Sequence, residues 1–202
     1  MVRKELLQEL KKLPNLFTLT RLLLIPGLWF LAIKGFSVYL GIGLVVAGLT
    51  DSIDGFLARR LNLQSEFGSQ FDSVADNILG PSAVIWLLML EPSVYLENKV
   101  ISLAGIFLYL VMMVVAWTKF RRFANLHLYS SKVSGTLLIV FEAHTFIFEG
   151  YNQDLFLFVV SISILSVFEL LVLLFTQDHV DEHMGSVVRV YLMKKRSIDS
   201  VD

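Results

Sequence analysis

Four aspartates stand within residues 51–76, DSIDGFLARRLNLQSEFGSQFDSVAD, where two long apolar runs of the sequence meet. Residues three or four apart share one face of a helix, so helical runs would pair Asp51 with Asp54 and Asp72 with Asp76. Carboxylates so close together need protons or a counter-charge, and oxygen ligands favour Mg²⁺, Mn²⁺ or Ca²⁺ over softer metals. Two facing helices are therefore predicted to offer four carboxylates to one cation site.

The residues around these aspartates indicate phosphate chemistry. Gly55 and Gly68 leave room for a ligand to approach the backbone, and Arg59 follows Asp54 by about one helical turn. An arginine in this place is suited to a phosphate or a diphosphate. Two alternatives stay open here, namely the buried aspartates of an ion channel or proton-coupled transporter, and structural ion pairs at a helix end.

The composition places this motif in a membrane protein. Of the 202 residues, 55% are hydrophobic and 17% are charged, and the mean hydropathy is +0.68. We therefore expect an all-α integral membrane protein with a single domain. Apolar stretches close to the roughly 20 residues that cross a bilayer predict a bundle within residues 13–176, with six transmembrane helices at 13–33, 38–58, 71–90, 100–117, 133–148 and 155–175. A short amphipathic interfacial helix is expected at 1–12, and a cytoplasmic tail at 177–202.

The positive charges predict how the bundle is oriented. With six transmembrane helices, 15 of the 17 lysines and arginines fall on the side that also holds both termini and the acidic motif, and only Lys34 and Lys99 fall on the other. Positively charged loops face the cytoplasm in membrane proteins. Both termini and the acidic motif are thus predicted to be cytoplasmic.

Eight residues at fixed spacing carry a resemblance to a known family. The chain resembles the CDP-alcohol phosphatidyltransferases along its whole length, and it matches their signature at Asp51, Asp54, Gly55, Ala58, Arg59, Gly68, Asp72 and Asp76. The resemblance implies an enzyme of phospholipid biosynthesis that transfers a substituted phosphate from a CDP-linked donor, usually CDP-diacylglycerol, to an alcohol and releases CMP. It also implies a homodimer with Mg²⁺ or Mn²⁺, as two ions, at the cytoplasmic side.

The resemblance further implies a role for each residue of the signature. Asp51, Asp54 and Asp72 resemble the metal ligands, whereas Asp76 resembles the residue that both touches the metal site and takes the proton from the acceptor hydroxyl. The residues that resemble those receiving the nucleotide and its diphosphate are Gly55, Ala58, Arg59 and Gly68. A carboxylate base beside a charge-neutralising metal site agrees with this chemistry.

The acceptor alcohol is predicted from weaker signals. Asn15, Thr18 and Arg21 resemble the polar opening of the first span in members that accept glycerol 3-phosphate, which is therefore the leading acceptor. Four residues are expected to bind it, namely Arg21, Arg121, Arg122 and Lys132. Their alternative role is contact with lipid headgroups. Other acceptors stay open, including inositol phosphate, serine and phosphatidylglycerol, as does transfer from a CDP-aminoalcohol to diacylglycerol.

Other polar residues in the sequence are expected to be structural. Glu142, His144 and Glu169 lie in predicted transmembrane helices, where pairing inside the bundle or at a dimer face explains them. The stretch HVDEH at 179–183 has a zinc-protease spacing, but it is short and lacks an evident third ligand. The expected partners are the lipid donor, a small alcohol, membrane lipids and a second copy of the chain, and no nucleic acid.

Overall fold

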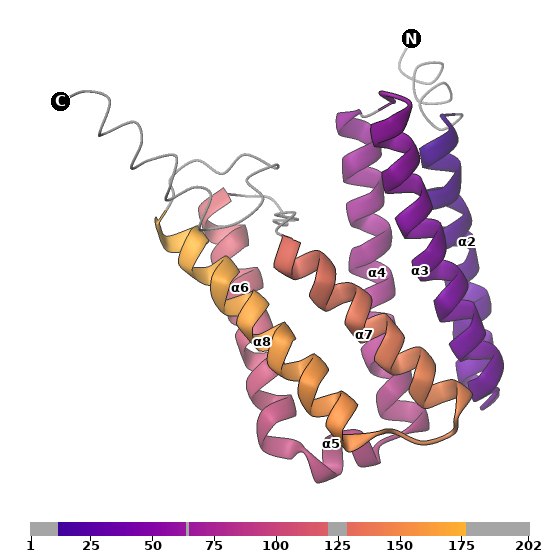
Figure 1. Cartoon of the computed structure of the whole chain (residues 1–202), viewed down its shortest axis with the longest axis vertical. Coiled ribbons are helices and arrows are strands. Elements are labelled where there is room, and N and C mark those ends of the chain that lie inside the picture. The colour runs from indigo at the N-terminus through magenta and orange to yellow at the C-terminus, as the bar shows by residue number, and fades with distance from the viewer. Residues whose placement is uncertain (1–11, 64, 121–128, 177–202) are drawn as a thin grey trace. The chain divides into compact units, whose positions relative to one another are not determined.

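A computed structural model describes residues 12–63, 65–120 and 129–176, and these residues form helices and short connections (Figure 1). The helices are α2 (Leu13–Ile33), α3 (Ser37–Arg60), α4 (Glu66–Leu90), α5 (Ser93–Glu97), α6 (Lys99–Phe120), α7 (Tyr129–Ile147) and α8 (Gln153–Thr176). The predicted all-α class is confirmed for this part of the chain. The predicted interfacial helix, apart from Lys12, and the predicted tail lie outside the described residues.

Five of the described helices are long and apolar enough to cross a membrane: α2, α3, α4 from Phe67, α6 and α8. Large apolar side chains such as those of Leu23, Val100 and Phe175 are exposed on them, as expected for surfaces that face lipid. The fifth predicted transmembrane segment, 133–148, coincides with most of α7. Helix α7 is not among the five, and its sequence carries Lys132, Glu142 and His144.

The connection between α3 and α4 is shorter than predicted. The sequence predicted one helix ending at residue 58 and the next beginning at residue 71, but α3 continues to Arg60 and α4 begins at Glu66. Helix α4 begins early because the Ser65 side chain accepts a hydrogen bond of 3.1 Å from the backbone N–H of Gly68, which is an N-cap. All four aspartates consequently lie on regular helix.

The described helices belong to two compact units, of which the first contains residues 12–96 and 139–152. In this unit α2 packs against both α3 and α4, and the three helices run side by side (Figure 1). The second half of α7 also packs on α3, because a side chain at Gly41 would come within 2.7 Å of Ile147. Leu40, Leu44 and Trp86 are fully buried in the core of this unit.

The second unit contains residues 97–138 and 153–176 of the described chain. Helices α6 and α8 pack together, and Asn98 and Gln153 exchange two amide hydrogen bonds of 3.2 and 2.7 Å near their starts. At the other end the Lys119 ammonium donates to the carbonyl oxygen of Leu174 at 2.7 Å. The first half of α7 joins α8 through a hydrogen bond from Ser134 to Ser163 at 3.0 Å.

Candidate functional site

The four aspartates of the motif meet one arginine inside the first unit. Helix α3 carries Asp51 and Asp54 one turn apart, and α4 carries Asp72 and Asp76 one turn apart. Because the connection between these helices is short, the helices return past each other and bring both acidic pairs to the same place. The fifth member, Arg21, comes from α2, which packs on both helices.

The guanidinium of Arg21 contacts all four carboxylates. Its Nη1 lies 2.7 Å from Asp51 Oδ1, 2.7 Å from Asp76 Oδ1 and 3.2 Å from Asp72 Oδ1. Its Nη2 donates to Asp54 Oδ2 at 2.6 Å. A buried charge is tolerated only when it is paired, and the aspartates supply this pairing. Four carboxylates face one guanidinium, so the site keeps an excess of negative charge whenever all of them are ionised.

The site is closed on one side and open on the other. The Arg21 side chain is 0% exposed and that of Asp54 is 7% exposed. The side chains of Asp51 and Asp76 are 45% and 46% exposed. Asp54 thus forms the floor of the site, while Asp51 and Asp76 can be reached from outside the unit.

Two further polar residues of α2 line the closed side. Thr18 lies nearly one turn before Arg21, and its hydroxyl donates to Asp54 Oδ2 at 3.2 Å. Asn15 is buried, and its Oδ1 would lie 2.8 Å from a side-chain carbon at Gly68. The polar face of α2 therefore packs directly against the acidic motif.

The carboxylates are arranged in a way that fits a divalent cation. Asp51, Asp72 and Asp76 each offer one oxygen, and these three oxygens lie within 4.8 Å of one another. Hard oxygen donors at this spacing suit Mg²⁺ or Mn²⁺. Sequence reasoning predicted the gathering of the four aspartates but not the arginine among them. The signal was present, because Arg21 is a cation in an apolar run on the predicted side of the motif.

The residues predicted to receive the nucleotide lie beside this site on the same two helices. Arg59 is exposed, and its Nη1 lies 3.5 Å from where a side-chain carbon at Gly55 would be. Ala58 is half-buried one position earlier. Gly68 has a packing role as well, since a larger residue there would collide with Asn15. The nucleotide roles of these four residues stay predictions.

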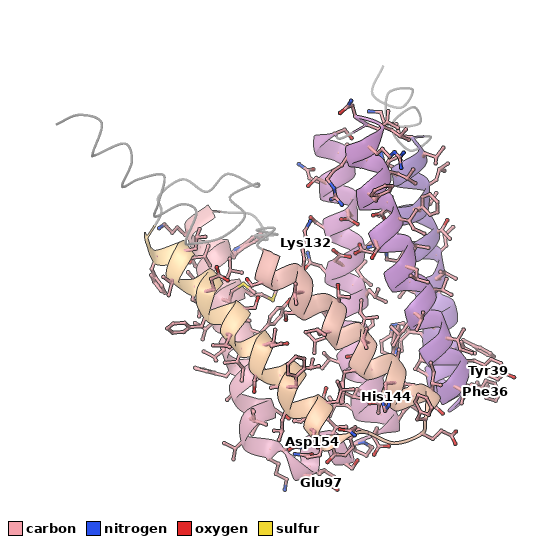
Figure 2. All side chains as sticks on the ribbon, in the orientation of Figure 1. Phe36, Tyr39, Glu97, Lys132, His144 and Asp154 are labelled. Carbon is pink, nitrogen blue, oxygen red and sulfur yellow. The ribbon has the colours of Figure 1, made fainter. Side chains whose placement is uncertain are left out.

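Of the residues predicted to bind the acceptor, Arg21 belongs to the first unit and Lys132 to the second. Arg21 lies among the aspartates, so the alternative that it only reaches lipid headgroups is wrong. Lys132 is exposed in the first turn of α7, within the second unit (Figure 2). Arg121 and Arg122 lie outside the described residues, as does the HVDEH stretch.

The other three polar residues singled out in the predicted transmembrane helices lie on α7 and α8. Glu142 is buried in α7, and the ring of His144 packs against that of Phe148 with centroids 4.7 Å apart (Figure 2). Glu169 lies on α8 and has an interaction partner. None of these three residues belongs to the group around Arg21.

Comparison with known proteins gives one family. The model of the CDP-alcohol phosphatidyltransferase family matches residues 11–175. A CDP-diacylglycerol–glycerol-3-phosphate 3-phosphatidyltransferase of Rickettsia typhi is 38% identical over 82 residues, which are 39% of this chain and 46% of the relative. The enzyme of that name from Wigglesworthia glossinidia brevipalpis is 40% identical over 81 residues, 39% of this chain and 43% of the relative.

A second group of relatives has a different name. The human cardiolipin synthase (CMP-forming) is 45% identical over 69 residues, which are 33% of this chain and 23% of the relative. The chain thus spans less than half the length of these curated relatives. No solved structure matches the chain significantly.

Proposed function

Because the chain belongs to the CDP-alcohol phosphatidyltransferase family, we propose that it transfers a phosphatidyl group from CDP-diacylglycerol to glycerol 3-phosphate and releases CMP. One observation carries the proposal. In this integral membrane protein the buried guanidinium of Arg21 contacts four carboxylates, those of Asp51, Asp54, Asp72 and Asp76. The bacterial relatives named for this reaction support the choice of donor and acceptor.

The four aspartates would hold the metal, proposed as two Mg²⁺ or Mn²⁺ ions. Bound there, the ions would neutralise charge on the diphosphate and on the leaving CMP. The exposed Arg59 would donate to the diphosphate, beside Gly55, where the helix carries no side chain, and Ala58 and Gly68 would complete the nucleotide site. The donor's lipid chains and its aqueous headgroup require such a site at the edge of the membrane.

Asp76 is proposed as the general base. Its side chain is 46% exposed at the open side of the site, so an acceptor hydroxyl can reach it. The carboxylate would take the hydroxyl proton as the acceptor oxygen bonds to the phosphorus of the phosphatidyl group. The bond from that phosphorus to the CMP oxygen would break at the same centre.

The acceptor phosphate is proposed to bind positively charged side chains. The candidates are Arg21, Arg121, Arg122 and Lys132. Lys132 is exposed in the first turn of α7, so an anion can reach its side chain. Six transmembrane helices, with α7 as the fifth, would place the active site and both termini in the cytoplasm, and the active form would be a homodimer.

The function is tested by measuring CMP release from CDP-diacylglycerol and Mg²⁺ by the purified full chain. Each acceptor is offered separately, and EDTA is added in a parallel sample. Release with glycerol 3-phosphate alone, lost in EDTA, is the expected result. No release with any acceptor would contradict the proposal and favour a different CDP-alcohol donor or the transporter alternative.

Phosphatidylglycerol is the second candidate acceptor, because the human relative that is 45% identical over its matched part is named a cardiolipin synthase. The two acceptors differ in a way that the same assay resolves. Glycerol 3-phosphate is soluble, whereas phosphatidylglycerol must enter from the bilayer. Release of CMP with phosphatidylglycerol in vesicles, and none with glycerol 3-phosphate, would select this second function.

A further inference from the structure

One nitrogen of Arg21 lies where the oxygens of three aspartates converge. Nη1 contacts Asp51 Oδ1 at 2.7 Å, Asp76 Oδ1 at 2.7 Å and Asp72 Oδ1 at 3.2 Å. The same three residues form the group whose ligand oxygens lie within 4.8 Å of one another. The guanidinium thus contacts the three residues that a divalent cation would use.

We propose that Arg21 is the resident counter-ion of the acidic site, and that a divalent cation displaces its guanidinium from Asp51, Asp72 and Asp76 and so frees it for an anionic group of the substrate. The proposal rests on the proposed function, since it takes the aspartates as the metal ligands. It adds a direct competition between a side chain and the metal, and it links metal binding to the availability of a phosphate-binding arginine.

Competition follows from distance and charge. Mg²⁺ binds oxygens at about 2.0–2.1 Å, and a guanidinium nitrogen needs about 2.7–2.9 Å. A cation that coordinates one oxygen from each of the three aspartates needs the space among them, which Nη1 holds. A metal cation and a guanidinium at one position would also repel each other, and this repulsion is strong where bulk water does not screen it. The metal and Nη1 therefore cannot both contact these three aspartates in their present places.

The hydrogen bonds of Arg21 leave one of its three side-chain nitrogens without a partner. Its Nε is buried and has no hydrogen-bond partner among the described residues. A buried donor without a partner is unfavourable. An arginine in its final role on a phosphate commonly uses Nε together with one Nη in a bidentate contact. The unpartnered Nε therefore indicates, independently of the acidic cluster, that the guanidinium is suited to bind a further acceptor.

The shape of the site gives the displaced group a direction. Asp51 and Asp76 are nearly half exposed, whereas Asp54 is buried. Nη1 faces the open pair and Nη2 faces Asp54, whose Oδ2 also accepts from Thr18. The Nη2 contact with Asp54 can persist while Nη1 leaves the other three aspartates on the open side. This is the side from which a diphosphate or a phosphorylated acceptor would approach.

The movement is tested on the wild-type chain with an arginine-specific dicarbonyl reagent, read by peptide mass spectrometry. The purified chain in detergent is labelled in EDTA and in saturating Mn²⁺, without substrate. We expect Arg21 to be protected in EDTA and to label at least about tenfold faster in Mn²⁺. Arg60 is exposed and contacts the ring of Phe56, so it serves as the internal reference and should label equally in both. Equal protection of Arg21 in both conditions would overturn the proposal.

The competition is tested by the affinity for Mn²⁺, measured from the free-ion signal in electron paramagnetic resonance. Arg21→Met should bind Mn²⁺ at least about tenfold more tightly than wild type, because the competing cation is gone. Arg60→Met removes an equal charge from the end of α3 and should stay within about twofold of wild type. Unchanged or weaker binding by Arg21→Met would show that the arginine holds the ligands in place rather than competing for them. Arg21→Lys, with intermediate affinity expected, replaces Arg21→Met if that variant does not fold.

The two proposals fail in different ways. Wild-type protein that binds no Mn²⁺ and releases no CMP would contradict the proposed function and this inference together. Wild-type protein that binds Mn²⁺ and releases CMP, while Arg21 stays protected in Mn²⁺, would contradict the displacement of Arg21 alone.

Discussion

Asp76 has the two properties that a general base needs in this site. It contacts the acidic centre through Arg21 at 2.7 Å, and 46% of its side chain is exposed. Asp54 has the first property without the second, because its side chain is 7% exposed. Exposure thus argues against Asp54 as the base. Asp51 is 45% exposed and lies at the same 2.7 Å from Arg21, so the choice of Asp76 stays a proposal that rests on the family resemblance.

The role of Asp76 can be tested with Asp76→Asn. We expect CMP release to fall by about 10²–10⁴-fold, the usual contribution of a general base. Binding of CDP should remain largely intact, since it rests mainly on the other ligands. Isothermal titration with CDP and Mg²⁺ measures this binding, and the matched Asn77→Ala variant is the control on the same helix. Near-normal turnover by Asp76→Asn would remove Asp76 as the base.

Lys132 is predicted to act on the acceptor alone. Lys132→Ala should raise the KM for glycerol 3-phosphate by at least about tenfold, because one charged contact to phosphate is lost, and should change the KM for CDP-diacylglycerol much less. Lys34→Ala is the control, since Lys34 lies over the ring of Phe30 in the first predicted loop on the opposite side. Steady-state CMP release at varied acceptor measures both constants. An unchanged acceptor KM would place Lys132 outside the acceptor site.

At the scale of helices, the geometry of the site depends on the close packing of α2 on the first turn of α4. Asn15 and Ser65 lie against Gly68, where a side-chain carbon would be 2.8 Å from Asn15 Oδ1 and 3.2 Å from Ser65 Oγ. Ser65 is also the N-cap of α4. A single glycine therefore allows α2 to bring Arg21 to the aspartates while α4 keeps its cap.

This packing predicts opposite effects for two glycines of α4. Gly68→Ala should destabilise the fold by about 1–3 kcal/mol through overpacking, and should lower the affinity for Mn²⁺ because α2 is pushed away from the aspartates. Gly80→Ala has no atom within 4 Å of the added carbon and should be neutral or stabilising. Thermal unfolding in detergent compares the two variants with wild type. Equal melting temperatures for both would contradict the packing role of Gly68.

At the scale of the whole molecule, the charge distribution predicts the topology. Five described helices have the length and apolarity of membrane spans, and α7 is proposed as one more, which makes six. With six, the connection between α3 and α4 is predicted on the cytoplasmic side, and those after α2 and α7 on the other. A bundle of five transmembrane helices without α7 and a bundle of six with α7 place the connection after α7 on opposite sides of the membrane.

The topology can be measured directly because the sequence contains no cysteine. Single-cysteine variants Leu61→Cys, Lys34→Cys and Gly150→Cys are each labelled with a membrane-impermeant maleimide in intact cells and in inverted vesicles. We expect Leu61→Cys to react only in inverted vesicles, and the other two only in intact cells. Reaction of Gly150→Cys in inverted vesicles alone would contradict six transmembrane helices.

The sequence by itself determined the helices and the acidic motif, because both depend on local order. Apolar stretches of membrane-spanning length and the three- and four-residue spacing of the aspartates are properties of a single helix. The helix ends differed from the prediction, because the cap at Ser65 starts α4 earlier than the apolar pattern indicated. The family signature, whose residues all lie on α3 and α4, was likewise readable from spacing alone.

Only the tertiary structure decided what neutralises the aspartates. Arg21 is 30 or more residues from each of them in sequence, and its place depends on how α2 packs against α3 and α4. No periodicity encodes such a contact, since the same arginine on a helix rotated by half a turn would face lipid headgroups. In the structure Asn15 of α2 lies against Gly68 of α4. With α2 in this place, Arg21 supplies the cation that the buried Asp54 and its three neighbours require.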